Sequence, residues 1–579
     1  MKKQKRNIKS RLLLQLLVVL TIIVAINLIS SIVYTRFDLT AEKRYTLSKE
    51  TMEVIKNLDD IVYFKVYLEG EFPAGFKRLR RETMEMLDEF RAFNKNIQYE
   101  FINPSISTDK KERNDTYKLL VQQGLNPTNL QVKTNSGLDQ QVIFPGAIVS
   151  YRENDLPIEL LDAQMNTPPE AVLNNSIQSL EFKLANTIHK LTLRNKHSVV
   201  FIHGHGELGE METYDIASAL SQDYVVGRMP IDGKIDALLD RRLVDTVNQV
   251  FELKPKYSAI IIANPDSTFD GKDRFIIDQY IMYGGKVLWL IDPLFASMDS
   301  LQTSESAIAV EKPLDLQGQL FTYGVKLNND LITDLISLAI PLRTGMVGNK
   351  PQIEFFPWYY FPLITPITEH PIARNLNAIK TQFVSSIDTT FGGVKKTILL
   401  KTSPYSRTLG SPAIINLAIT RQQPDERMYI GPQKNIAVLL EGEFLSDFRN
   451  RIPPEIANDK EIGFKAQSVE TRMILVSDGD MIRNQFHIQD GYPLPLGYDQ
   501  FTRETYGNKD FILNALSYLV DGPGLISSRS KEMKLRLLDK TKINRNKFFW
   551  QYFNLLFPLV LILILAVIMI WTRKRKYSR

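Results

Sequence analysis

The chain has 579 residues, of which 44% are hydrophobic and 23% are charged, a composition typical of globular proteins and long enough for two or three domains. It contains no cysteine, which excludes disulfides, thiolate metal sites and a cysteine nucleophile within this chain. The net charge of +6 comes from basic tails without acids at 1–11 and 572–579, so the body between them is mildly acidic. This charge pattern argues against nucleic-acid binding.

Two uncharged apolar stretches, 12–34 and 553–571, are each long enough to cross a bilayer as a helix. The basic tails beyond them predict that both termini are cytoplasmic. We therefore expect a two-pass protein of the inner (cytoplasmic) membrane with the bulk of its chain in the periplasm. The basic stretch 527–552 precedes the second span and is either a membrane-lipid contact or a solvated linker.

The first region between the spans, 35–173, alternates predicted strands and amphipathic helices. Ser48 is a suitable N-cap for a helix that ends near Leu58. The later elements are strand 61–68, helix 76–93, strand 97–102, helix 110–123 and strands near 130–133, 141–151 and 158–161. Their order is compatible with a thioredoxin-like α/β domain without thioredoxin chemistry, for which we expect a binding or spacer role. A helix at 174–195 is predicted to connect this domain to the next.

The second domain, 196–526, begins with three short apolar runs at 198–202, 258–263 and 286–291. Runs that are apolar on both faces are typical of strands in a parallel sheet. An amphipathic helix at 272–282 separates the last two runs and is expected to end at Gly284 and Gly285. Further strands are predicted at 434–440 and 472–476, and a closing helix at 510–519. The turns after parallel strands share the carboxyl edge of the sheet, where ligands usually bind.

The polar residues of these turns are the main candidates for ligand binding. His203, His205 and Glu207 follow the first strand, and an extended chain would place them on one face. Asp266, Asp292 and Asp478 follow later strands and would reach the same edge. His203, His205 and Glu207, with Asp292 or Asp478, offer donors for a divalent metal. The alternative is that the histidines only stabilise a glycine-rich turn, and we predict neither a metal nor another cofactor.

Nucleotide chemistry is not indicated by the sequence. Gly204, Gly206 and Gly209 formally match a dinucleotide-binding pattern, but the acids at Glu207, Glu210 and Glu212 would repel a pyrophosphate. The chain contains neither a G-x-x-x-x-G-K-[ST] motif nor a G-x-S-x-G nucleophile elbow. ATP hydrolysis within this chain is therefore not expected.

An aromatic tract occupies 353–362. It contains Trp358, Tyr359 and Tyr360, whose rings could form a platform for a sugar or a partner protein. The alternative, which we favour, is a loop whose rings pack onto a core.

Six segments taken together carry a resemblance. They are 38–48, 290–293, 356–362, 491–498, and the turns His203-Gly-His-Gly-Glu207 and Ser477-Asp-Gly-Asp480. The chain resembles the gliding-motility-associated (Gld) auxiliary subunits of ABC transporters over nearly its full length. The resemblance implies a separate membrane permease and a separate cytoplasmic ATPase, which are GldF- and GldA-like in that system. It also implies that the second domain is similar to class I glutamine amidotransferases, whose cysteine nucleophile this chain lacks.

The sequence thus predicts two extracytoplasmic α/β domains, thioredoxin-like and then glutamine-amidotransferase-like, between two transmembrane helices. We interpret it as a non-catalytic, substrate-binding-type subunit whose cargo is unidentified. One alternative is a metal-dependent hydrolase of envelope material that uses His203, His205, Glu207, Asp292 and Asp478. Another is a glycan-binding module that uses Trp358, Tyr359 and Tyr360.

Overall fold

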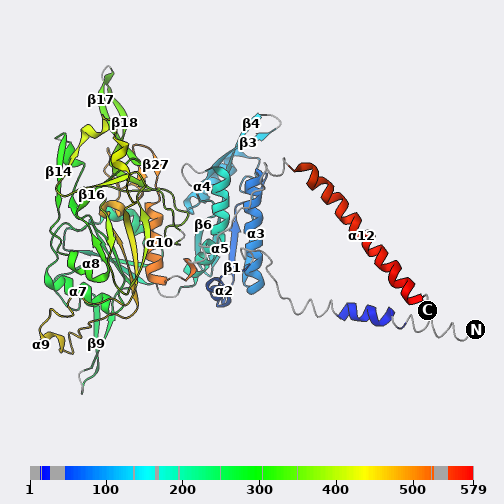
Figure 1. Cartoon of the computed structure of the whole chain (residues 1–579), viewed down its shortest axis with the longest axis horizontal. Coiled ribbons are helices and arrows are strands. Elements are labelled where there is room, and N and C mark those ends of the chain that lie inside the picture. The colour runs from blue at the N-terminus through cyan, green and yellow to red at the C-terminus, as the bar shows by residue number, and fades with distance from the viewer. Residues whose placement is uncertain are drawn as a thin grey trace, which may run out of the picture. The chain divides into compact units, whose positions relative to one another are not determined.

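Figure 1 shows a computed structural model of the chain. It describes residues 14, 16–25, 46–134, 137–162, 168–193, 196–247, 250–302, 304–347, 350–368, 370–522, 524–526 and 546–577. The chain separates into two units, and the smaller one contains helix α12 (Lys547–Tyr577). Each unit is described on its own. Residues 527–545 of the predicted basic linker and about half of the predicted first span lie outside the described residues.

The first domain is a four-stranded sheet with the order β2–β1–β5–β6. Its strands are β1 (Val62–Val66), β2 (Ile97–Phe101), β5 (Gly146–Tyr151) and β6 (Asn154–Glu159). Strands β1 and β2 are parallel, and the remaining pairs are antiparallel. The helices are α2 (Lys49–Lys56), α3 (Ala74–Phe93), α4 (Lys110–Gln122) and α5 (Pro169–Thr192). The predicted connecting helix, α5, also packs against α2 and α3 of this domain.

Local signals in this domain act largely as the sequence predicts. The Ser48 hydroxyl accepts a hydrogen bond from the Thr51 amide at 3.2 Å and so caps α2. The single strand predicted at 141–151 is wrong, because the chain there forms β4 (Gly137–Ile143) and β5. Pro145 lies between them and cannot donate a ladder hydrogen bond. Strand β4 instead pairs with β3 (Thr128–Thr134) as a hairpin.

The second domain is built on a nine-stranded sheet. Its parallel half has the order β25–β12–β11–β7–β8, formed by β25 (Thr471–Val476), β12 (Val287–Leu290), β11 (Ala259–Ala263), β7 (Ser198–His203) and β8 (Val225–Pro230). The other half is antiparallel and contains β24 (Asn435–Gly442), β21 (Lys395–Lys401), β20 (Ile387–Thr389) and β15 (Val325–Leu327). The predicted parallel strands are thus confirmed, within a sheet that is mixed.

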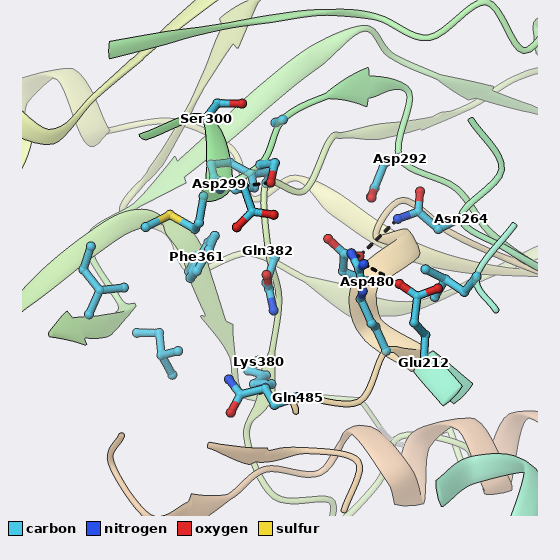
Figure 2. A pocket seen from close by; sticks show the side chains of 18 of the residues that line it. Glu212, Asn264, Asp292, Asp299, Ser300, Phe361, Lys380, Gln382, Asp480 and Gln485 are labelled. Atoms are coloured by element: carbon cyan, nitrogen blue, oxygen red, sulfur yellow. Dashed lines mark hydrogen bonds and ion pairs between the residues drawn. The ribbon is translucent and has the colours of Figure 1, made fainter. Parts of the chain in front are cut away.

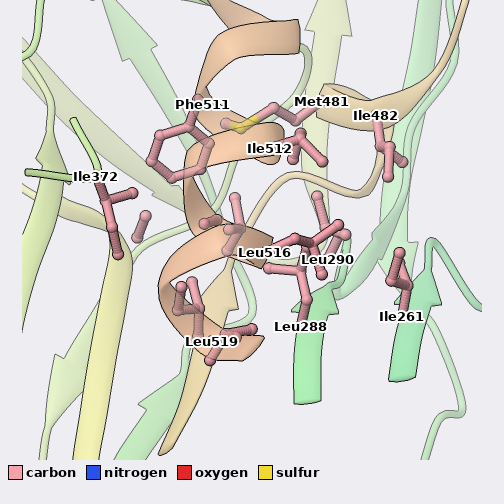
Figure 3. Close-up of a cluster of buried hydrophobic side chains, with 14 of the residues drawn as sticks. Ile261, Leu288, Leu290, Ile372, Met481, Ile482, Phe511, Ile512, Leu516 and Leu519 are labelled. Atoms are coloured by element: carbon pink, nitrogen blue, oxygen red, sulfur yellow. The ribbon is translucent and has the colours of Figure 1, made fainter. Parts of the chain in front are cut away.

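Both faces of the parallel half are buried, as the apolar runs predict. Leu288 and Leu290 of β12 point into one core, and Val287 and Trp289 point into the other. Helices α6 (Tyr214–Ser221) and α10 (Asn508–Asp521) cover the first face, and α7 (Gly271–Met282) and α8 (Gln317–Tyr323) cover the second. Figure 3 shows α10 laid across β12, with Leu516 next to Leu288 and Leu290.

Helix α7 has the start and end that its sequence predicts. The Asp270 carboxylate accepts hydrogen bonds from the amides of Lys272 and Asp273, both at 2.8 Å. At the other end, Gly284 adopts a φ of +95°, the left-handed conformation that terminates many helices. The helix boundaries are therefore fixed by local chemistry at both ends.

Removing this cap gives a first testable expectation. Replacement of Asp270 by alanine should lower the free energy of unfolding by about 1 kcal/mol, because two amides at the helix start lose their acceptor. Asp270→Asn keeps an acceptor oxygen and should stay close to wild type. Urea unfolding of the three proteins measures the difference, and equal midpoints for Asp270→Ala and wild type would contradict it.

The aromatic tract is not the loop that the sequence analysis favours. It lies in β18 (Lys350–Ile364), which pairs with β17 (Ser337–Val347) as a long hairpin and with β19 (Ile379–Lys380). Trp358 is fully buried, and Tyr360 and Phe361 share its core. The rings pack onto a core, as expected, but they do so from a strand. This part of β18 is buried on both faces.

Helix α12 is the one candidate for a membrane span among the described residues. The most apolar 18-residue window of Lys547–Arg575 has a mean hydropathy of 3.0, and none of that window is buried. It includes the predicted span 553–571, and it continues through Pro558. At the other end of the chain, Leu16–Ala25 is a shorter apolar helix.

Candidate functional site

The carboxyl edge of the parallel half opens into a cavity of about 920 Å³. Strands β7, β11, β12 and β25 are parallel, so the turns that follow them meet there. Of the predicted residues, Glu207, Asp266 and Asp292 line this cavity. The opposite wall comes from β17, β18 and the segment after β19, and Figure 2 shows residues of both walls. The predicted edge is therefore also the place where the second domain is hollowed.

The turn after β7 does not present its two histidines together. Gly204 and Gly206 have φ of +130° and +75°, so the chain is not extended and the period-two argument fails. His203 is exposed, whereas His205 is 4% exposed and stacks on Phe269 with 3.7 Å between ring centroids. His205 Nε2 lies 3.0 Å from Asp273 Oδ2, and Nδ1 lies 3.3 Å from Glu207 Oε1. His205 is thus a buried, ion-paired residue of the turn.

These partners also set the charge of His205. Burial lowers its pKa, but Glu207 and Asp273 outweigh burial and hold the pKa above 6.5. A histidine with a raised pKa stabilises the fold fully below the pKa of the unfolded chain, about 6.5, and this stabilisation is lost as pH rises through the folded-state pKa.

Glu207→Gln should therefore lower the pKa of His205, which histidine-ring NMR measures directly. The variant should lose more stability at pH 6 than at pH 9, because only the protonated ring needs the carboxylate. The exposed Glu210→Gln is the matched control and should leave both quantities unchanged. An equal loss at the two pH values would contradict the assignment.

Metal binding finds no support at this edge. In the described ranges, no group of three or more His, Asp or Glu side chains is placed to hold a metal ion. His203 is exposed whereas His205 is buried, and both nitrogens of His205 already face carboxylates. The residues present do not fit the metal-dependent hydrolase that the sequence left open.

The turns after β12 and β25 bring carboxylates together, as predicted for Asp292 and Asp478. Asp292 Oδ1 accepts a hydrogen bond from the Gly479 amide at 2.6 Å, and Asp478 Oδ2 accepts one from the Gln382 amide at 3.0 Å. Asp478 is fully enclosed, and its Oδ1 has no hydrogen-bond partner within the described part of the chain. Burial and the neighbouring carboxylates raise the pKa of Asp478 well above its usual range.

The pKa of Asp292 is also raised. Burial, and then the charge of Asp480, raise the pKa of Asp292 to about 7, although Lys312 opposes the rise. Asn264 connects these groups, because its amide donates to Asp480 at 3.1 Å and its oxygen accepts from Lys312 at 2.6 Å. We call this group the acid wall: it consists of Asp292, Asp478 and Asp480 with Asn264, joined by hydrogen bonds between the turns after β11, β12 and β25 (Figure 2).

Two glycines make this wall possible. A Cβ at Gly206 would lie 1.6 Å from Asp266 Oδ1, and a Cβ at Gly479 would lie 2.4 Å from the Asn264 side chain. The turns approach each other so closely that only glycine fits at either position. The glycines quoted in the two sequence motifs thus have a packing explanation.

Several cavity residues are absent from the sequence analysis. Lys312 follows β14 (Ser306–Glu311), Lys380 is the last residue of β19, and Gln382 lies just after that strand. No motif marks them, and only the fold brings them to the carboxyl edge. Trp358 and Tyr359 do not line the cavity, and Trp358 has no exposed ring face for a sugar.

Comparisons with known proteins place most of the second domain in a family. The family model described as "ABC-type uncharacterized transport system" matches residues 196–515, which is more than half of the chain. A second model, a domain of unknown function, matches residues 41–150. No curated protein sequence matches the chain.

Two solved structures resemble the chain weakly. The mmIFT52 N-terminal domain aligns with 12% identity and a TM-score of 0.30, over 56% of this chain and 98% of that one. A ThuA-like protein from Parabacteroides merdae aligns with 8% identity and a TM-score of 0.24, over 57% of this chain and 91% of that one. At these scores neither likeness supports an argument about fold or function.

Proposed function

This chain belongs to the ABC-type uncharacterized transport system family, and from that premise we propose that it is a non-catalytic, membrane-anchored auxiliary subunit of an ABC transporter. The family match over residues 196–515 carries the proposal. The absence of a nucleotide-binding motif supports it, since a transporter with such a subunit needs a separate ATPase. Helix α12 supplies a membrane anchor by length and composition.

The finer proposal concerns topology and partners. We place the bulk of the chain in the periplasm, between two spans, with both termini in the cytoplasm beside a permease and an ATPase of the GldF and GldA kind. The basic tails support this orientation. The strand order β2–β1–β5–β6 supports a thioredoxin-like first domain that acts as a spacer. The transporter would serve gliding motility.

The cavity at the carboxyl edge is the proposed place for cargo or a partner segment. Its volume of about 920 Å³ lies within the range of small-ligand sites, and it combines apolar walls with a few placed polar groups. Glu207, Asp266 and Asp292 are its predicted members, while Asp478 acts behind them from an enclosed position.

Co-purification from the native membrane tests the central claim. A tagged chain, solubilised in mild detergent, should bring down one permease and one ATPase, and a tagged, unrelated two-pass protein of the same membrane should not. Recovery of the chain without either subunit would overturn the proposal. Protease added to intact spheroplasts should digest the body, whereas protection until lysis would overturn the topology alone.

A further inference from the structure

The cavity contains a buried lysine without a partner. Lys380 is 5% exposed and lines the cavity, yet among the described residues its ammonium makes no hydrogen bond or ion pair. The other cations of the lining are engaged: Lys312 donates to Asn264 and to the Pro265 carbonyl, and Arg483 binds Asp480 and Glu212. Lys380 therefore differs from the other two cations that line the cavity.

Hydrogen bonds hold the backbone around Lys380 in place. The Asn508 side chain accepts from the Lys380 amide at 3.1 Å and donates to the Lys380 carbonyl at 2.9 Å. Two residues further on, the Gln382 amide donates to Asp478 at 3.0 Å. These hydrogen bonds fix the main chain from which the Lys380 side chain extends.

An unpaired ammonium in such a place is unfavourable. Burial lowers the pKa of Lys380, and Asp499, Asp478 and Asp480 oppose the effect only from beyond ion-pair distance. A buried charge normally has a hydrogen-bonded counter-ion. An anionic group that enters the cavity would supply the counter-ion that Lys380 lacks among the described residues.

The other residues that line the cavity limit the kind of molecule that can carry this anionic group. Acidic side chains outnumber basic ones, and they include Glu207, Glu212, Asp266, Asp292, Asp480 and Asp499. These acids would repel a phosphate or another multiply charged anion. A ligand with one negative charge for Lys380 and a positive charge elsewhere for the acids would fit both walls of the cavity. Leu338, Ile340, Phe361 and Phe383 add an apolar surface.

We propose that the cavity binds the free carboxyl end of a short peptide, with the terminal carboxylate against Lys380 and a cationic group of the peptide against the acid wall. Figure 2 shows Lys380 and Gln485 at one end of the cavity, Asp292 and Asn264 at the other, and Gln382 between them. The Gln382 side-chain amide makes no hydrogen bond among the described residues, so it is available to a peptide group. This inference rests on the proposed function, because it names the cargo class of the same cavity.

The test uses the full chain in detergent and two randomised tripeptide libraries. One library has free carboxyl ends, and the other is carboxamidated. The free-acid library should raise the melting temperature, and the amide library should bind about tenfold or more weakly, because it cannot form the charged hydrogen bonds to Lys380. Equal effects of the two libraries, or no effect of the free acids at millimolar concentration, would overturn the proposal.

Lys380→Met separates binding from folding. It should bring the free-acid affinity down to that of the amides, while the unliganded protein stays as stable as wild type or becomes more stable, since no ion pair is lost. Exposed Lys326→Met is the matched control and should bind like wild type. Unchanged binding in Lys380→Met, or a clear loss of unliganded stability, would overturn the assignment. Co-purification of permease and ATPase does not depend on this result, so the two proposals fail separately.

Discussion

Trp289→Ala is expected to lower the free energy of unfolding of the second domain by roughly 3–5 kcal/mol, the largest effect we expect of a single substitution. Trp289 lies on β12, between β11 and β25, and it is fully buried. Its removal would leave a cavity in the core that the sheet shares with α7 and α8. The neighbouring strands β11 and β25 are hydrogen-bonded to β12 and so are not free to move in and fill it.

The comparison with phenylalanine sharpens this expectation. Among the residues that the structure describes, the indole nitrogen of Trp289 has no hydrogen-bond partner, so Trp289→Phe loses only part of the packing and should cost clearly less than alanine. Phe391→Ala, at a fully exposed position, should change little. Guanidinium unfolding followed by circular dichroism ranks the three variants. A Trp289→Ala midpoint like that of Phe391→Ala would contradict the role given to β12.

The second large effect depends on pH. Asp292→Asn should be more stable than wild type above about pH 7, by up to about 4 kcal/mol, taking about 1.4 kcal/mol for each unit between the ordinary pKa and about 7. Burial makes the ionised Asp292 unfavourable in the folded chain, and asparagine is neutral at every pH. Because the raised pKa stabilises the wild type only while the acid is protonated, the gap should open as pH rises from about 4 to about 7 and then stay constant.

Unfolding of both proteins at several pH values between 4 and 9 measures this gap. The exposed Asp236→Asn is the matched control and should follow the wild-type curve. Asparagine keeps the oxygen that accepts from Gly479, so the variant should fold normally. A constant difference between Asp292→Asn and wild type across the whole range would show that Asp292 is ionised in the folded protein.

Strands β7, β11 and β12 of the parallel half were predictable because they are apolar on both faces, whereas the edge strand β8 lacks this pattern and was not predicted. Ala259–Ala263 has no polar residue, and its side chains alternate between two cores. The position of the acid wall was also predictable, because the turns that follow parallel strands meet at one edge of the sheet. Local end signals, such as Asp270 and Gly284 of α7, also act where their chemistry indicates.

The rest depends on contacts between distant segments or on backbone angles. His203 and His205 were expected on one face, but Gly204 and Gly206 allow a turn that extended spacing does not foresee. Lys380 belongs to no motif, and it reaches the cavity only because β19 pairs with β18. The buried strand β18 was hidden because an aromatic run does not distinguish a strand covered on both faces from a loop.

The position of β25 has a consequence for how the protein is made. Residues 471–476 insert between β12 and β24, and β12 ends at Leu290, far earlier in the chain than β25 begins. Until β25 has been synthesised, the emerging chain exposes the backbone groups on one edge of β12, a template for pairing with another chain. Pairing across so long a separation also closes slowly. A nascent chain that stalls before residue 471 is therefore the form most prone to aggregate, and a chaperone that covers β12 would protect it.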